Sequence, residues 1–575
     1  MNTNHIEFEV TIQNPHLHYF HVKAIFPTDK KKIKLSLPAW SPGSYMIRDY
    51  ITHLHDLRVK DENGLDIKFE FSDLETIKIH SNSKKVIVYY TIYSFESTVR
   101  NNYLDSSYGF IQPTALFLFN KKNLDSKIKI KFILNGYFQH VYSSLNRSGL
   151  EFFAEDFDEL YDSPFQISNN QSKSFETSST KHEVIVEGKI TDEIYNDLLR
   201  DLKIITEYET QIFQGNPNKY YLFIINLTED NYGGLEHRAS SVNAFDPSNL
   251  AENHEYNRLL ALLAHEYFHL WNVKRIRPNE LGPFDYLKPN LTKELWIAEG
   301  ITSFYDNYVL YKNSFYYRSE YIDEVLKDIN TLTESIADER MSLEESSFST
   351  WVKFYKKNNN SHNNGISYYV KGAVFSFCLN LRILQVTESQ RSLDDVMRYL
   401  NEEFAKKDIG ITKYDFFDSV EKITGIDLLP EFDEYLSQKK RIPIEKYFSI
   451  IGYVLEKKSK QLSLPFEMKT SSGNEIVSKI FEGLIQNTDI QIGDEIIAVN
   501  NQRASKQNLE KILAEISLNH DLAIIISRKA IIKTVHWTPK VASKYFISYP
   551  ISIAEFEDVV NKNLIAKKFF EVEKG

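Results

Sequence analysis

Two histidines and a glutamate stand close together in residues 264–275, AHEYFHLWNVKR. If this segment is helical, His265 and His269 lie on one face and can offer two imidazole nitrogens to one metal ion. Glu266 follows the first histidine, where its carboxylate can reach a water held by the same ion. This spacing indicates a zinc hydrolase. The competing interpretation is a helix whose histidines make ordinary hydrogen bonds in a protein core.

A catalytic zinc usually has three protein ligands and one position open to water. The candidate third ligand is Glu299, in LWIAEGITSFYDNYV (295–309). Its apolar neighbours Leu295, Trp296 and Ile297 predict burial, and a buried carboxylate needs a partner. The loop after His269 is long enough to return a second helix beside the first, so we expect one Zn²⁺ on His265, His269 and Glu299.

The order of the surrounding patterns predicts several folding units, as expected for a chain of 575 residues. Residues 5–170 alternate in short apolar runs typical of a β-sandwich, and a polar stretch at 168–182 reads as a linker or long loop. A strand (182–188), a helix (about 190–213) and a strand (219–227) follow. Helical spacing dominates about 253–440, and residues 256–273 are apolar on most faces, which predicts that the histidine helix is buried.

After about residue 448 the pattern changes to short strands with one late helix, which predicts a small β-barrel-like module. The fold class expected is therefore multidomain α+β. We place an N-terminal β-sandwich domain at 1–175, a mostly helical catalytic domain at 176–447, a small β domain at 448–540 and a tail that docks on the body at 541–575.

Composition narrows the classes of partner. Apolar residues make up 42% and charged residues 26%, the balance of a soluble globular protein. A formal charge of −11 argues against a nucleic-acid partner. The chain shows no secretory signal pattern and no apolar stretch long enough for a membrane helix, and Cys378 is its one cysteine. We expect a cytoplasmic protein with no membrane partner.

Several separated motifs resemble a known family. HEYFH followed by LWIAEG resembles the gluzincin metallopeptidases, whose catalytic domain is thermolysin-like. Together, WSPGSYMIRDY (40–50), GGLEHRAS (233–240), HEYFHLWNVKRIRP and YYVKGAV resemble the glycyl aminopeptidase family that carries a C-terminal PDZ domain. The segment GDEIIAVN (493–500) is similar to a run in PDZ domains, although no clear carboxylate-binding loop accompanies it.

The resemblance implies roles for individual residues. Glu266 would be the general base, and Tyr369 would donate a hydrogen bond to the tetrahedral oxyanion. Glu236 would bind the free α-ammonium of the substrate, on a segment with Gly233 and Gly234 that lies along the substrate as an edge strand. The expected ligand is a peptide with a free amino terminus.

The leading hypothesis is a zinc-dependent aminopeptidase, with a preference for amino-terminal Gly and Ala that only the resemblance implies. One alternative is a PDZ-type peptide-binding or chaperone-like scaffold with a non-catalytic peptidase body. A second keeps the zinc chemistry in an endopeptidase or a hydrolase of a non-peptide substrate. A peptide or protein ligand of the PDZ-like domain is a further candidate partner.

Overall fold

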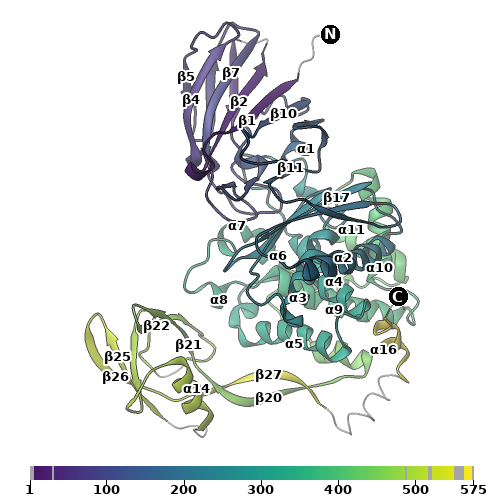
Figure 1. Ribbon diagram of the computed structural model, residues 1–575. Coiled ribbons are helices and arrows are strands. Elements are labelled where there is room, and N and C mark those ends of the chain that lie inside the picture. The colour runs from purple at the N-terminus through teal and green to yellow at the C-terminus, as the bar shows by residue number, and fades with distance from the viewer. Residues whose placement is uncertain (1–4, 29–30, 486–487, 516–520, 549–561, 573–575) are drawn as a thin grey trace. The chain divides into compact units, whose positions relative to one another are not determined.

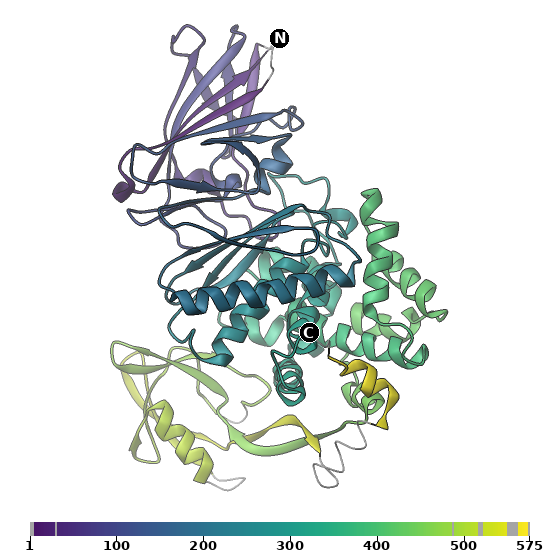
Figure 2. The ribbon, with the colours of Figure 1, turned by 45° about the vertical axis from the view of Figure 1, so that its right-hand side comes forward.

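The computed structural model describes residues 5–28, 31–485, 488–515, 521–548 and 562–572 (Figures 1 and 2). Their Cα positions divide into two compact units. The first comprises residues 1–291 with 400–410, and the second comprises residues 292–399 with 411–575. Each unit is described by itself below.

The first unit begins with the β-rich region predicted from the sequence, which is confirmed. Side chains of β2 (Tyr19–Pro27) alternate strictly between buried and half-buried, because successive residues of a strand point to opposite faces. β2 belongs to a seven-stranded sheet in the order β12-β13-β10-β1-β2-β7-β4. Its other strands are β1 (Ile6–Ile12), β4 (Leu54–Asp61), β7 (Lys85–Tyr93), β10 (Ile128–Ile133), β12 (Asn146–Ser148) and β13 (Glu151–Ala154).

Two smaller sheets and short helical turns complete this region. Their strands are β3 (Lys32–Ser36), β5 (Phe69–Phe71) and β6 (Thr76–His80) in one sheet, and β8 (Tyr103–Leu104), β9 (Gly109–Ile111), β11 (His140–Tyr142) and β14 (Phe165–Ser168) in the other. The turns are η1 (Pro15–Leu17), η2 (Tyr50–His53), η3 (Pro113–Ala115) and α1 (Phe157–Tyr161). One contiguous apolar core, which includes Phe8, Phe117 and Phe165, lies among these sheets.

The first unit also contains a five-stranded sheet in the order β15-β16-β17-β19-β18. Its strands are β15 (Lys173–Glu176), β16 (Lys181–Glu187), β17 (Tyr220–Leu227), β18 (Tyr232–Glu236) and β19 (Ser240–Phe245). β16 and β17 are parallel, and α2 (Asp192–Ile212) makes the crossover that parallel strands require. The predicted linker at 168–182 is not irregular throughout, because residues 173–176 form β15 and the Phe175 ring stacks on His182 at 4.6 Å.

Helix α3 (Asn253–Phe268) carries the histidine motif and packs against β18, β19 and α2. Its buried side chains include six consecutive residues, Leu259–Ala264, so the predicted burial is confirmed. Tyr267 joins the last turn of α3 to strand β16, because its hydroxyl lies 2.9 Å from His182 Nε2. The same hydroxyl accepts a hydrogen bond from Asn216 Nδ2 at 2.6 Å. The short turn η4 (Asn279–Leu281) follows in the loop after α3.

The second unit is helical in its first part, and α9 (Tyr368–Val386) packs against the π-helical turn η5 (Trp296–Gly300) and the helices α4 (Ile301–Lys312) and α5 (Arg318–Glu334). The remaining helices and turns are η6 (Ile336–Glu339), α6 (Leu343–Phe348), α7 (Thr350–Lys353), α8 (Ser361–Asn364), α11 (Lys413–Thr424), α12 (Leu429–Ser437), α13 (Ile444–Phe448) and η8 (Ser449–Ile451). α10 (Leu393–Glu403) runs across the division between the units, and η7 (Ala405–Lys407) belongs to the first.

The C-terminal strands follow the predicted change of pattern. β20 (Val454–Ser463) and β27 (Lys540–Ser548) form an antiparallel ribbon (Figure 1). Between them lies a second sheet with the helix α14 (Lys506–Glu515). Its strands are β21 (Phe466–Ser471), β22 (Asn474–Ile480), β23 (Glu495–Val499), β24 (Gln502–Arg503), β25 (Leu522–Arg528) and β26 (Ile531–Trp537).

The end of the chain differs in part from the tail expected at 541–575. Residues 540–548 continue the ribbon as β27, and residues 549–561 lie outside the described residues. The last helix, α16 (Leu564–Phe569), packs on α9. The Tyr308 and Phe569 rings lie 5.4 Å apart, and the Tyr311 hydroxyl donates to the Phe570 carbonyl at 2.7 Å.

Across the described ranges, no helix combines the length and the apolar character needed to cross a membrane.

Candidate active site

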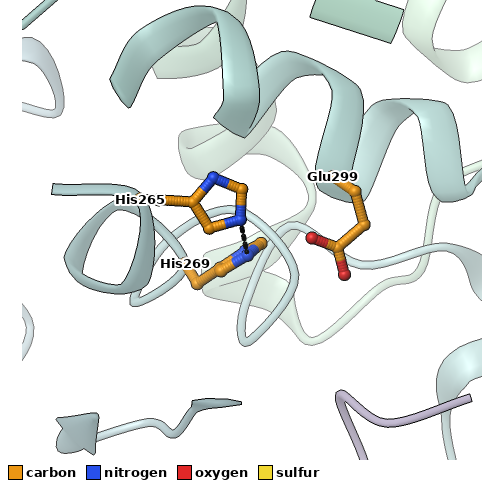
Figure 3. Close-up of side chains that lie close together, drawn as sticks. All are labelled: His265, His269 and Glu299. Atoms are coloured by element: carbon orange, nitrogen blue, oxygen red, sulfur yellow. Dashed lines mark hydrogen bonds between the residues drawn. The ribbon is translucent and has the colours of Figure 1, made fainter. Parts of the chain in front are cut away.

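His265 and His269 present their Nε2 atoms to each other at 3.0 Å (Figure 3). His265 lies in the last turn of α3, and His269 is the C-cap residue with helical dihedral angles, so the four-residue spacing keeps both rings on one face. His269 Nδ1 donates to the Asn272 carbonyl at 2.7 Å, because a carbonyl oxygen can only accept. This bond places the proton on Nδ1 and leaves the Nε2 lone pair for a metal.

Glu299 supplies a carboxylate to the same group. One ligand atom from each of His265, His269 and Glu299 lies within 4.8 Å of the other two, and Figure 3 shows the carboxylate turned toward both rings. Tetrahedral zinc with Zn–N distances of about 2.0–2.1 Å places two nitrogens about 3.3 Å apart. The observed 3.0 Å between the Nε2 atoms is close to that value. The two nitrogens and one buried oxygen therefore fit a zinc ion.

The turn that carries Glu299 is π-helical, a local widening often found at functional positions. Aromatic packing holds this turn against α9, where the Trp296 ring lies 5.1 Å from the Phe375 ring. Its last residue, Gly300, lies against Gly372 of α9: a Cβ added at Gly300 would lie 2.6 Å from the Gly372 Cα. No other residue type allows the two backbones to approach this closely, so the glycine pair sets the position of Glu299 relative to α9.

A second group brings two carboxylates beside His269. Atoms of Glu236, Glu266 and His269 lie within 4.8 Å of one another, and all three side chains are buried. Glu236 ends the edge strand β18, as the family resemblance implied for this segment. A Cβ added at Gly234 would lie 1.9 Å from Glu266 Oε1, so only glycine allows the Glu266 carboxylate to lie directly against this strand.

The WSPGSY loop, to which the sequence assigned no role, lies against Glu236. Gly43 has φ +87°, and a Cβ added there would lie 2.5 Å from Glu236 Oε2. Ser41, beside it, lies 2.9 Å from the Tyr50 hydroxyl and accepts from Gln112 Nε2 at 3.2 Å, which fixes the loop from behind. The family motif at 40–50 therefore forms part of the wall around the Glu236 carboxylate.

Asp162 ties the end of β18 to the segment after α3. Its carboxylate accepts from the Arg238 backbone N–H at 2.8 Å and from Lys274 Nζ at 2.9 Å, and it lies 3.1 Å from His237 Nδ1. Burial opposes its ionisation, but Lys274 and His237 outweigh burial and hold the pKa of Asp162 far below its ordinary value. Sequence reasoning missed this residue, because a lone aspartate in a β-rich region carries no motif.

The neighbours Tyr368 and Tyr369 open helix α9 and differ in environment. Tyr368 is fully buried, and its hydroxyl accepts from Thr350 Oγ1 at 3.1 Å. Tyr369 is only partly buried. Burial, and then the Glu299 carboxylate, raise the pKa of Tyr369 well above its usual value, so its hydroxyl keeps the proton that a donor needs at neutral pH.

Zinc metallopeptidases typically have a helix with two histidines four residues apart and an intervening glutamate, and a carboxylate from another helix as the third metal ligand. Profiles of two domains of one family match this chain: the M61 glycyl aminopeptidase at residues 258–375 and the M61 peptidase N-terminal domain at residues 7–169. The chain thus carries both of these domains of the M61 peptidase family. It is accordingly a zinc-dependent aminopeptidase, a hydrolase of peptide bonds.

Among solved structures, an aminopeptidase N family protein from Idiomarina loihiensis is 25% identical, with a TM-score of 0.89, and the match covers 97% of this chain and 100% of that one. An M1 zinc metallopeptidase from Deinococcus radiodurans is 10% identical, with a TM-score of 0.46 over 77% of this chain and 95% of that one. Native yeast LTA4 hydrolase is 12% identical, with a TM-score of 0.45 over 78% and 70%. The search of curated proteins gave no match.

Proposed function

We propose that this aminopeptidase removes small amino-terminal residues, glycine and alanine above all, and that it holds one zinc ion on His265, His269 and Glu299. The donor chemistry supports this ligand set: two imidazole nitrogens and a buried carboxylate converge, and a backbone carbonyl fixes the tautomer of His269. When bound, zinc acts as a Lewis acid that lowers the pKa of a water molecule to about 7.

Glu266 is proposed as the general base. Its carboxylate belongs to the second group, beside His269, and lies directly against β18. From there it takes a proton from the attacking water and returns it to the nitrogen of the leaving amine. Tyr369 is proposed to donate a hydrogen bond to the oxyanion that forms on the scissile carbonyl, and its raised pKa keeps that donor protonated.

In this proposal Glu236 binds the α-ammonium of the substrate and so makes the enzyme specific for free amino termini. One observation supports this role. The side chain of Glu236 is buried, and among the described residues its Oε1 accepts no hydrogen bond. A buried carboxylate oxygen without a donor is costly. The α-ammonium of a peptide provides the missing donors and a compensating charge, whereas an internal peptide nitrogen provides no charge.

The preference for small residues is supported by the loop beside Glu236. Because Gly43 lies so close to the carboxylate that even a methyl group would collide with it, little space remains on that side of the bound ammonium. Ser41 and Pro42 are buried, and Ser41 is anchored by hydrogen bonds, so the loop has little freedom to retreat. A bulky first residue would have to displace this wall.

The test compares alanine amide with its N-acetyl derivative. We expect cleavage of the free amine only, and we expect Glu236→Gln to lower kcat/KM by about 10²-fold or more, as loss of a buried charge partner does. Glu266→Gln is the matched control: it should retain zinc, measured by elemental analysis, while losing turnover. Equal cleavage of the acetylated amide would show that Glu236 does not bind the α-ammonium, and it would favour an endopeptidase. A purified chain that lacks zinc and turns over neither amide would instead favour the scaffold.

A further inference from the structure

A large cavity of about 1030 Å³ lies within the second unit and is not used by the chemistry described above. One wall comes from the helical part, from the end of α5 through α7 and α8 to the first turn of α9. The opposite wall comes from β21, β22 and the segment that follows, including Glu467, Lys479 and Phe481.

Specific hydrogen bonds hold the two walls together beside the cavity. The Ile480 carbonyl accepts from His362 Nε2 and from Asn363 Nδ2, both at 2.7 Å, and the Glu482 backbone N–H donates to Asn363 Oδ1 at 3.1 Å. Arg340 Nη2 adds an ion pair to the Glu482 carboxylate at 2.7 Å. The volume between the walls is therefore bounded by defined contacts.

The charge of the lining is positive, in a chain whose formal net charge is −11. The lining contains three carboxylates, and each is paired with a cation of the same lining: Glu334 with Lys544 at 2.8 Å, Glu339 with Arg441 at 3.1 Å and Glu467 with Lys479 at 2.6 Å.

Three further lysines line the cavity beyond these pairs. Lys357 lies over the Phe354 ring at 4.9 Å and Lys457 over the Tyr545 ring at 5.7 Å, and Lys353 lies on α7. None of the three makes an ion pair with a carboxylate within the described part of the chain. The lining thus has an excess of three positive charges, offered to whatever occupies the cavity.

The cavity lies next to the residue proposed as the oxyanion donor. Ser367 and Val370 of the lining flank Tyr369 along the chain, and the Phe354 ring, which also lines the cavity, lies 5.7 Å from the Tyr369 ring. An extended peptide advances about 3.3 Å per residue. About two residues of an extended peptide therefore span the 5.7 Å between the Tyr369 and Phe354 rings. A short oligopeptide is long enough to enter the cavity.

We propose that this cavity binds the carboxyl-side part of a peptide substrate and selects acidic residues there. The inference rests on the proposed function, because it assigns the occupant as the continuation of the peptide whose amino terminus is cleaved. Lys353, Lys357 and Lys457 supply the cations, and apolar lining residues such as Phe354 and Phe481 accept the aliphatic parts of the chain.

The experiment compares two amidated pentapeptides, Ala-Ala-Glu-Glu-Glu and Ala-Ala-Gln-Gln-Gln, with alanine amide as a substrate too short to reach the cavity. We expect the acidic peptide to have a kcat/KM about 10-fold higher than the neutral one, mainly through a lower KM, and the difference to shrink at high salt. The double variant Lys353→Gln/Lys357→Gln should lose about 3- to 10-fold on the acidic peptide and leave alanine amide unchanged.

Lys356→Gln is the matched control, because this exposed lysine lies between the other two in sequence but outside the lining. Equal kcat/KM for the two pentapeptides, or the same loss in Lys356→Gln, would overturn the proposal. If alanine amide itself is not cleaved, the aminopeptidase assignment of the site fails instead. The cavity is then still tested by fluorescence anisotropy, in which a labelled Ala-Ala-Glu-Glu-Glu peptide should bind the natural chain more tightly than the double variant.

Discussion

At the scale of single residues, two adjacent tyrosines show how position on a helix separates packing from chemistry. Tyr368 is enclosed and receives a hydrogen bond from Thr350, whereas Tyr369 is partly exposed and lies in the electrostatic field of Glu299. The sequence could not separate them, because they precede Lys371 of the Lys-Gly pair by three and two residues and both are expected on a helix.

This difference gives a paired test. Tyr369→Phe should lower kcat on alanine amide by about 10²- to 10³-fold, the effect of removing one oxyanion donor, with little change in Tm. Tyr368→Phe should have the reverse profile, because it removes a buried hydrogen bond worth about 1 kcal/mol and leaves the reacting carbonyl untouched. Steady-state kinetics and thermal melts of both variants decide the matter, and a larger kinetic loss in Tyr368→Phe would exchange the two assignments.

At the scale of elements, the site depends on how closely backbones approach one another. β18 meets α3 at Gly234, and η5 meets α9 at Gly300 and Gly372. Glycine in the middle of a helix is normally unfavourable by about 0.5–1 kcal/mol relative to alanine. α9 nevertheless carries Gly372, and the contact with Gly300 explains why: a side chain there would push away the turn that holds Glu299.

Gly372→Ala tests this explanation by the sign of its effect. A Cβ at this position would meet the Gly300 Cα at 2.6 Å, so we expect a lower Tm and zinc binding weaker by about 10- to 100-fold, in the range seen when the support of a metal ligand is disturbed. Zinc affinity is measured by competition with a chromophoric chelator. If the glycine were present only by chance, alanine would raise the Tm through its better helix propensity, and zinc affinity would not change.

At the scale of the whole molecule, zinc bound at a local group of side chains should raise the free energy of unfolding of the whole chain. Two overlapping sets of donors share His269, one completed by His265 and Glu299 and the other by Glu236 and Glu266. A ligand that binds only the folded chain stabilises it by about 2.7 kcal/mol at a concentration 100 times its Kd. Thermal stability therefore reports which set holds the ion.

We expect a chelator such as 1,10-phenanthroline to lower the Tm of the natural chain by several degrees and added zinc to restore it. Glu299→Gln should lose most of this zinc-dependent shift, whereas Glu236→Gln and Glu266→Gln should keep it. Scanning calorimetry with and without zinc provides the measurement. The opposite pattern would show that Glu236, Glu266 and His269 hold the metal, and that Glu299 is not a ligand.

Much of the site could be predicted from the chain alone, because helical periodicity is a local property. The spacing of His265, Glu266 and His269 fixes their common face on any α-helix. The apolar flanks of Glu299 indicated its burial, and the alternation of apolar residues gave the β-rich start and the change to strands near residue 448. Each of these features depends on neighbours in sequence, so the sequence by itself determined them.

Only the tertiary structure decided which distant residues share a wall. The contact of Gly43 with Glu236, the link from Asp162 to Lys274 and the close approach of Gly300 to Gly372 join segments that no periodicity connects. The polar stretch at 168–182 looked like a linker because its composition is that of a loop, yet part of it pairs with β16. Long-range packing sets these distances, and a pattern of residue types carries no distance between segments far apart in the chain.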